Sequence, residues 1–291
     1  MTMRADHDET LEQARARNIR DALAEDIGSG DRTAMLVPAG RRVRARVTVR
    51  EAAVLAGREW FDGCLLALDA AARVDWRYAD GDAMAADTAV CEIEADARAL
   101  LSAERPALNF LQLLSATATE TRRHVDAIAG ASPNPRGCAV LDTRKTIPGL
   151  RLAQKYAVRV GGGRNQRLAL WHGILIKENH ITAAGGVTAA LHDARALDAG
   201  VEIQIEVETL DQLREALAAG ATSVLLDNFD LARMREAVAL TAGRALLEAS
   251  GGVSLATLRD IAATGVDRIS IGHLTKDVKA VDFSLRVLDR L

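Results

Sequence analysis

The clearest candidates for chemistry lie between residues 141 and 167, in the stretch LDTRKTIPGLRLAQKYAVRVGGGRNQR. Here Arg144, Lys145 and Arg167 surround three consecutive glycines. The whole chain has a net charge of -3, from 37 basic and 40 acidic residues, so these cations are a local feature. Grouped Arg and Lys suit a small ligand with several negative charges. We expect them to bind an anionic substrate; the alternative is that they are solvated loop residues.

More polar side chains follow short apolar segments. The segments are 138–142, 173–177, 201–208, 222–227, 245–250 and 267–272. At their carboxyl ends stand Thr143, Arg144, Lys145, Lys177, Glu206, Asp227, Ser250, Gly251, Gly252, Gly272 and His273. The carboxyl ends of parallel strands meet at one edge of an α/β sheet or barrel, and that edge carries the active site. We therefore expect these residues to form one site.

Lys177 follows the apolar segment GILI, which places it at the mouth of such a site. A lysine there is either an anion receptor or a Schiff-base nucleophile. A third interpretation is a structural ion pair with Glu206. The sequence alone leaves all three open.

Acidic residues make up the other charge at this mouth. Glu202, Gln204, Glu206 and Glu208 share one face at a period of two, and a buried strand must give at least one of these acids a cation or a metal. Asp227 ends the next strand. Two carboxylates beside bound phosphates suit Mg²⁺, so Glu206 and Asp227 are candidate metal ligands. The alternative is that they only pair with nearby lysine and arginine.

Two glycine-containing turns complete the set. Ser250, Gly251 and Gly252 follow one strand, and Gly272 with His273 follows the last. Such turns expose backbone N–H groups that can bind a phosphate. Taken alone they are more often simple turns.

The elements that position these residues fall into two regions. Residues 9–24 and 97 onward have helical periodicity, whereas RVRARVTVRE and AVCEIEADA alternate like strands with one solvated face. After residue 138, six strand segments alternate with helical ones, which predicts a parallel sheet, doubly wound or closed as a barrel. An eight-unit barrel needs about 250 residues, so we favour a six-stranded α/β barrel.

Composition excludes several classes of protein. No basic stripe is interleaved with aromatic residues, so nucleic acid is not an expected partner. No segment reaches the roughly 20 apolar residues of a membrane span, and the N-terminal 20 residues lack an apolar run, so we expect no membrane association and a cytoplasmic protein. Cys64, Cys91 and Cys138 are read as reduced core thiols, and the six histidines are scattered without a zinc motif.

With these residues assembled, the chain resembles the nicotinate-nucleotide pyrophosphorylase (carboxylating), or quinolinate phosphoribosyltransferase, family. The resemblance rests on EDIGSGDRT, ERPALNFLQLLSATAT, DTRKTIPGLRLAQKYAV, GGGRNQR, LIKENHI, IEVETLDQL, LLDNF, LEASGG and GVDRISIGHLT, in this order over nearly the whole chain. It implies an N-terminal α/β sandwich domain over 1–120, to which 276–291 return, and an incomplete six-stranded α/β barrel over 121–275.

The resemblance also implies a glycosyltransferase reaction in NAD biosynthesis. Ribose 5-phosphate would pass from phosphoribosyl pyrophosphate to quinolinate, giving nicotinate mononucleotide, pyrophosphate and CO₂. The residues implied to bind the carboxylates and phosphates are Arg105, Thr143, Arg144, Lys145, Gln166, Arg167, Lys177, Ser250, Gly251, Gly252, Gly272, His273 and Lys276. Those implied to be catalytic are Lys145, Lys177, Glu206 and Asp227, the last two beside Mg²⁺. Arg105 would be donated across a homodimer interface.

Some positions depart from the family pattern, among them Gln166 in place of the usual histidine and His172 in place of a common aspartate. We expect altered affinity rather than lost activity, because the cations remain. Three alternatives stay open: a molybdenum-transport-associated relative, a Schiff-base aldolase that uses Lys177, and a phosphoribosyl-ligand sensor or inactive paralogue.

Overall fold

The computed structural model describes residues 8–290, and its contacts divide the chain into two compact units. The first unit comprises Met1–Glu120, Thr146–Gly162 and Thr275–Leu291, and the second comprises Thr121–Lys145 and Gly163–Leu274. The sequence places 146–162 in the barrel, whereas the contacts place this segment in the first unit. The N-terminal segment without an apolar run includes residues 1–7, which lie outside the described residues.

The first unit is built on a four-stranded antiparallel sheet in the order β12-β1-β5-β3. Its strands are β1 (Arg42–Val49), β3 (Arg73–Trp76), β5 (Thr88–Asp96) and β12 (Phe283–Arg290), and β2 (Ala53–Val54) pairs separately with β4 (Ala83–Met84). Buried and partly exposed residues alternate strictly along β1, as its sequence predicts. One face of the sheet is therefore packed on the core.

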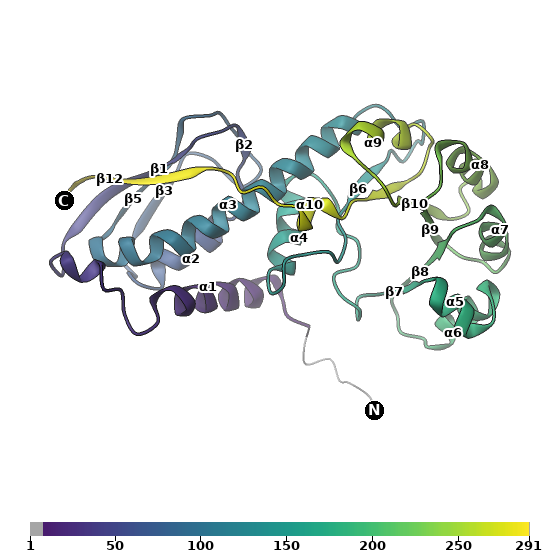
Figure 1. The fold of residues 1–291 in the computed structure, drawn as a ribbon, viewed down its shortest axis with the longest axis horizontal. Helices are drawn as coiled ribbons and strands as arrows, with labels where there is room; N and C mark the ends of the chain where they lie inside the picture. The colour runs from purple at the N-terminus through teal and green to yellow at the C-terminus, as the bar shows by residue number, and fades with distance from the viewer. Residues whose placement is uncertain (1–7, 291) are drawn as a thin grey trace. The chain divides into compact units, whose positions relative to one another are not determined.

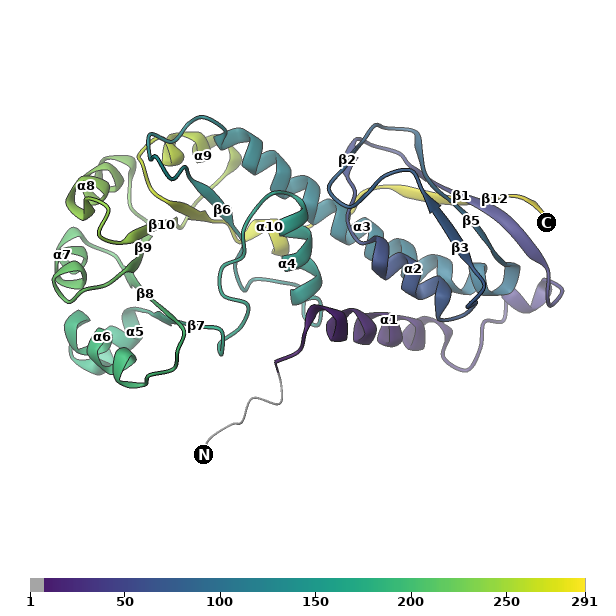
Figure 2. The ribbon, with the colours of Figure 1, turned by 180° about the vertical axis from the view of Figure 1, so that it is seen from behind.

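Helices also contribute to the first unit. They are α1 (Leu11–Ile27), the short η1 (Ala34–Leu36), α2 (Arg58–Leu66), α3 (Ala97–Ile128) and α4 (Arg151–Val160). Helices α2 and α3 run side by side along the sheet (Figure 2). Ala153 and Ala157 of α4 are fully buried in this core, and the Tyr156 hydroxyl donates to Asp80 Oδ2 at 2.7 Å. These contacts explain why α4 belongs to the first unit.

A partly buried carboxyl group lies between α2 and β3. Asp62 accepts a hydrogen bond from Trp76 Nε1, at 2.9 Å to one carboxylate oxygen and 3.2 Å to the other. Burial raises the pKa of Asp62 to about 6, although the Trp76 hydrogen bond and Arg58 act in the opposite direction. Ionisation of this carboxyl group at neutral pH is therefore less favourable in the folded protein than in the unfolded chain.

We expect Asp62→Asn to stabilise the protein above pH 6. The raised pKa means that the folded state binds the proton more tightly, so wild-type stability falls as pH rises from about 4 to 6 and stays lower above that range. The gain in unfolding free energy, discounted for partial exposure, is about 1–2 kcal/mol at pH 8, and it shrinks towards pH 4. Urea unfolding at both pH values measures it. Exposed Asp75→Asn is the control, and an equal gain at pH 4 would contradict the mechanism.

The second unit is a six-stranded parallel sheet in the order β6-β11-β10-β9-β8-β7. The strands are β6 (Ala139–Leu141), β7 (Gly173–Ile176), β8 (Glu202–Val207), β9 (Ser223–Asp227), β10 (Leu246–Ser250) and β11 (Arg268–Ser270). All six predicted strands are present. Because the end strands β6 and β7 do not pair with each other, the sheet is an incomplete barrel, and the predicted fold class is confirmed.

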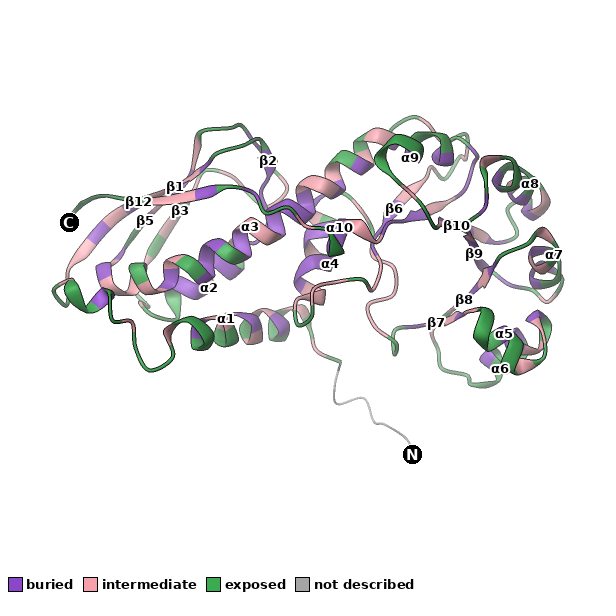
Figure 3. Ribbon diagram, viewed as in Figure 1, coloured by how far each residue is buried: buried purple, intermediate pink, exposed green. Residues whose placement is uncertain are grey.

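Helices line the outer side of this sheet (Figure 1). They are α5 (Glu178–Ala184), α6 (Val187–Ala196), α7 (Leu210–Ala218), α8 (Leu231–Thr241) and α9 (Leu255–Ala262), and the short α10 (His273–Lys276) follows β11. Strands β9 and β10 are almost wholly buried (Figure 3). The strand ends are thus held by a packed core.

Two sequence interpretations can be compared directly with the structure. The three cysteines are free thiols, and burial raises the pKa of both Cys64 and Cys138 to about 12. Within residues 8–290, no helix is both long enough and apolar enough to cross a membrane.

Candidate active site

The register of the parallel sheet shows which side chains share its inner face. Glu206 stands beside Leu225, and Asp227 stands beside Ser250. Leu225 and Asp227 are two residues apart along β9, so their side chains share a face. Their partners on the neighbouring strands lie on that face too, so Glu206, Asp227 and Ser250 point to the same side. The predicted convergence of these strand ends is therefore present in the second unit.

Two of the predicted cations, Arg144 and Arg167, lie near each other. Burial lowers the pKa of Arg167, and the neighbouring Arg144 guanidinium lowers it further. Within residues 8–290, no group accepts a hydrogen bond from the buried Nε of either arginine. Two like charges and two unused donors make this spot suited to an anion.

The segment after the three glycines is held by Asp142. This fully buried carboxylate accepts from Asn165 Nδ2 at 2.6 Å and from the Gln166 backbone N–H at 2.9 Å. Arg167 Nη1 donates to the Gly173 carbonyl at 2.9 Å. Of the three glycines only Gly162, with φ of 92°, has the left-handed backbone that favours glycine. Arg167 is thus positioned mainly by Asp142 and β7.

Lys177 directly follows β7 and faces Glu206. Its Nζ lies 3.0 Å from Glu206 Oε2 and 3.4 Å from Oε1. The ion pair that the sequence left open is therefore present. The lysine side chain is 45% exposed and the glutamate side chain only 11%, so the lysine can also reach a ligand in the site.

Asp227 lies at a tightly packed turn. It accepts from Asn228 Nδ2 at 2.9 Å, and the Asn228 backbone N–H donates to the Ser250 carbonyl. Gly251 has φ of 92°, and a Cβ atom there would lie 2.1 Å from Asn228 Oδ1. Only glycine fits this position, which brings the turn of Ser250, Gly251 and Gly252 close to Asp227.

Lys145 and Gly272 are also in close contact. A Cβ atom on Gly272 would lie 2.9 Å from Lys145 Cδ and 3.7 Å from Thr143 Oγ1. Thr143 Oγ1 in turn accepts from the Lys145 backbone N–H at 3.0 Å. His273 Nε2, by contrast, lies 2.9 Å from His124 Nε2 on α3.

A polar network that the sequence did not reveal crosses the inside of the second unit. Gln166 Nε2 donates to Gln204 Oε1 at 3.1 Å, and Gln204 Nε2 donates to Glu248 Oε2 at 2.9 Å. Arg268 Nε lies 3.4 Å from the same glutamate oxygen. Strand parity could have identified these inner positions, but no local signal shows which of them pair. Gln166 thus links the site to the interior.

Two predicted residues belong to the first unit. Arg105 is an exposed residue of α3 that lines a cavity of about 370 Å³ with α1 residues and the 148–150 turn. Lys276 is exposed, and its Nζ lies 3.5 Å from Asp277 Oδ2. The binding roles of both stay predictions, as do those of the second-unit residues.

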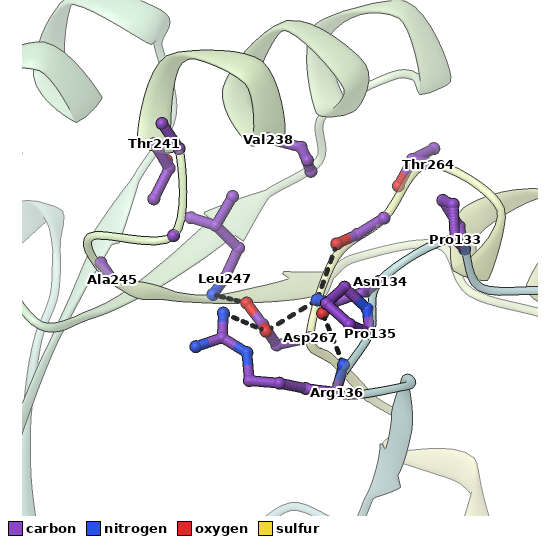
Figure 4. Close-up of a pocket in the computed structure, with 13 residues that line it drawn as sticks. Pro133, Asn134, Pro135, Arg136, Val238, Thr241, Ala245, Leu247, Thr264 and Asp267 are labelled. Carbon is purple, nitrogen blue, oxygen red and sulfur yellow. Dashed lines mark hydrogen bonds and ion pairs between the residues drawn. The ribbon is translucent and has the colours of Figure 1, made fainter.

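Two cavities of the second unit can be compared. One of about 410 Å³ is lined by Gln166, Arg167 and His172 together with Gln204 and Glu248. The other, of about 560 Å³, lies at the amino ends of β10 and β11 and contains none of the predicted residues (Figure 4). In this second cavity Asp267 accepts from Asn134 Nδ2 and from the Leu247 backbone N–H, both at 2.8 Å, so its polar groups fasten the 133–136 loop.

Comparisons with known proteins agree with the fold and the motifs. The family models for quinolinate phosphoribosyl transferase match residues 31–115 with the N-terminal domain and 117–286 with the C-terminal domain. The chain is 42% identical over 277 residues to the nicotinate-nucleotide pyrophosphorylase (carboxylating) of Mycobacterium leprae, covering 92% of this chain and 95% of that protein. A probable enzyme of the same name from Bacillus subtilis is 40% identical, with 90% of each chain covered. The solved Francisella tularensis nicotinate-nucleotide pyrophosphorylase superposes with a TM-score of 0.90 at 41% identity, covering 98% of this chain and 100% of that one.

Proposed function

Because the chain belongs to the quinolinate phosphoribosyltransferase family, we propose that it transfers ribose 5-phosphate from phosphoribosyl pyrophosphate to quinolinate. The products are nicotinate mononucleotide, pyrophosphate and CO₂, which makes the protein a glycosyltransferase of NAD biosynthesis. The observation that carries the proposal is the pair formed by Arg144 and Arg167. Each has a buried Nε from which no described residue accepts a hydrogen bond.

The two adjacent carboxylates of quinolinate fit this pair. A guanidinium can donate two parallel hydrogen bonds to a carboxylate, and each charged hydrogen bond contributes roughly 1.5–3 kcal/mol. Bound carboxylates would also relieve the repulsion between Arg144 and Arg167. Lys145, Lys177 and the two glycine turns then remain for the phosphates of the second substrate.

The acidic residues fit the magnesium that accompanies a pyrophosphate leaving group. Glu206 and Asp227 are carboxylates on neighbouring strands and the same face, and oxygen ligands of this kind are what Mg²⁺ prefers. When bound, the ion would neutralise charge on the departing pyrophosphate. Lys177 orients Glu206 through their ion pair.

The residues of the chain support the transfer by electrostatics. As pyrophosphate leaves, positive charge develops on the ribose carbon, and Glu206 or Asp227 can stabilise it from fixed positions. The pyridine nitrogen of quinolinate attacks that carbon, and the cationic ring then loses its adjacent carboxylate as CO₂. No covalent intermediate with the enzyme is needed, so Lys177 acts as a cation rather than a nucleophile.

The proposal includes a homodimer in which Arg105 reaches the site of the partner subunit. Its exposed position on α3 supports this role. A cytoplasmic location also stays a prediction.

The test is to incubate the purified protein with quinolinate, phosphoribosyl pyrophosphate and Mg²⁺ and to follow nicotinate mononucleotide and CO₂. We expect both products only when both substrates are present. Reactions without one substrate, or with EDTA, are the controls. Saturable binding of quinolinate without turnover would contradict the proposal and favour a ligand sensor.

The Schiff-base alternative has its own measurement. Borohydride reduction in the presence of a carbonyl substrate would add mass to Lys177 if that lysine formed an imine. We expect no added mass, because the Lys177 ammonium is held beside Glu206 as a charged partner.

A further inference from the structure

His273, one of the predicted site residues, meets a second histidine, His124, that has no role in the proposed transfer reaction. His124 is fully buried on α3, and His273 begins α10 directly after the site residue Gly272. They are 149 residues apart in the chain, yet their Nε2 atoms are 2.9 Å from each other. The histidines are scattered along the sequence, and the fold brings these two together.

The two rings meet through their nitrogens rather than through their faces. The ring centroids are 4.8 Å apart and the ring planes are tilted by 55°, so the rings are not stacked. When each Nδ1 carries the proton, each Nε2 presents a lone pair, and both lone pairs point to the same small volume. That is the arrangement in which two imidazoles bind one metal ion.

A carboxylate on the same helix adds a third donor. Glu120 precedes His124 by four residues, a spacing that places both side chains on one face of α3. Ligand atoms of the two residues lie within 4.8 Å of each other. Helical ligands four residues apart recur in zinc sites for this reason.

From these contacts we propose that His124, His273 and Glu120 form a binding site for a divalent first-row transition metal ion, with Zn²⁺ as the best fit to two nitrogens and one oxygen. Zinc lies about 2.0–2.1 Å from a histidine nitrogen, so tetrahedral coordination separates two such nitrogens by roughly 3.3 Å. The observed pair must open by about 0.4 Å, which a small rotation of the His273 side chain provides. Water supplies the fourth ligand.

This site is distinct from the Mg²⁺ proposed at Glu206 and Asp227 in both ligand type and place. Imidazole nitrogen favours zinc over magnesium, whereas the two carboxylates favour magnesium. Mg²⁺ in excess is therefore expected not to displace Zn²⁺ from the histidines. The proposal does not depend on the transfer reaction and can be tested by binding alone.

The experiment is calorimetric titration of the chelator-treated full chain with Zn²⁺ in excess Mg²⁺. We expect one site per chain in the wild type, with affinity weakened by roughly 10- to 100-fold or more in His273→Ala. His192→Ala is the matched control, since His192 is an exposed histidine of the second unit, and it should bind like the wild type. Co²⁺ titration should give an absorption band typical of tetrahedral coordination, which is lost in His273→Ala.

Two results would overturn the proposal. One is a wild type that takes up no Zn²⁺, which would leave the pair as a hydrogen bond between two imidazoles. The other is unchanged affinity in both His273→Ala and His124→Gln. Because His124 is fully buried, circular dichroism must first show that the His124→Gln variant is folded. If that variant does not fold, His273→Ala alone decides the test, because His273 is partly exposed.

Discussion

Lys177→Met is expected to lower kcat/KM for the transfer reaction by roughly 10²–10³-fold. Truncating one member of a partly buried charge pair costs about 2–5 kcal/mol, and each 1.4 kcal/mol corresponds to a factor of ten. The loss has two sources: the substrate phosphates lose a cation, and Glu206, whose side chain is only 11% exposed, loses its partner. Steady-state assays with each substrate varied in turn measure the loss.

A double variant separates these two sources. Glu206→Gln removes the charge that Lys177 neutralises while preserving the shape of the side chain. If Lys177 only supports Glu206, then Lys177→Met/Glu206→Gln should be no less active than Glu206→Gln alone. We expect the double variant to be less active, by at least roughly tenfold, because in the proposed mechanism the cation itself contacts substrate. Exposed Lys279→Met, in the segment after α10, is the matched control and should keep full activity.

The strand ends of the site could be predicted because the signal is local. A short apolar run that ends in Lys177 or Asp227 specifies both the strand and the polar residue that follows it. The period of two in β8 likewise predicted that at least one of its acids would meet a cation or a metal, and Glu206 pairs with Lys177. Such patterns need no knowledge of distant contacts.

Other features depend on contacts between distant segments. Helix α4 follows β6 as a barrel helix would, but Ala153 and Ala157 are buried in the core of the first unit. An amphipathic pattern shows that a helix has an apolar face and does not show which core buries it. The same limit applies to His124 and His273, since neither belongs to a motif that identifies its partner.

The second large expected effect is on the free energy of unfolding, and it concerns the polar network of Gln204, Glu248 and Arg268 inside the second unit. Arg268 Nε lies 3.4 Å from Glu248 Oε2, and the Arg268 guanidinium also donates to Ser223 Oγ at 2.6 Å. Glu248 is fully buried. Removal of the cation leaves a buried carboxylate with only the neutral Gln204 amide as a donor among the described residues. We expect Arg268→Met to lower the free energy of unfolding by about 3–5 kcal/mol, measured by urea denaturation followed by circular dichroism.

The cause of this loss can be tested by removing both charges. If the cost arises from an unpaired buried charge, Arg268→Met/Glu248→Met should recover at least about half of the lost stability, because an apolar pair of similar volume is often neutral relative to a buried ion pair. Arg233→Met removes a more exposed arginine, 3.7 Å from Asp230, and should change stability by no more than about 0.5 kcal/mol. A double variant less stable than Arg268→Met would instead show that the hydrogen bond from Gln204 to Glu248, rather than charge neutralisation, holds the interior of the second unit together.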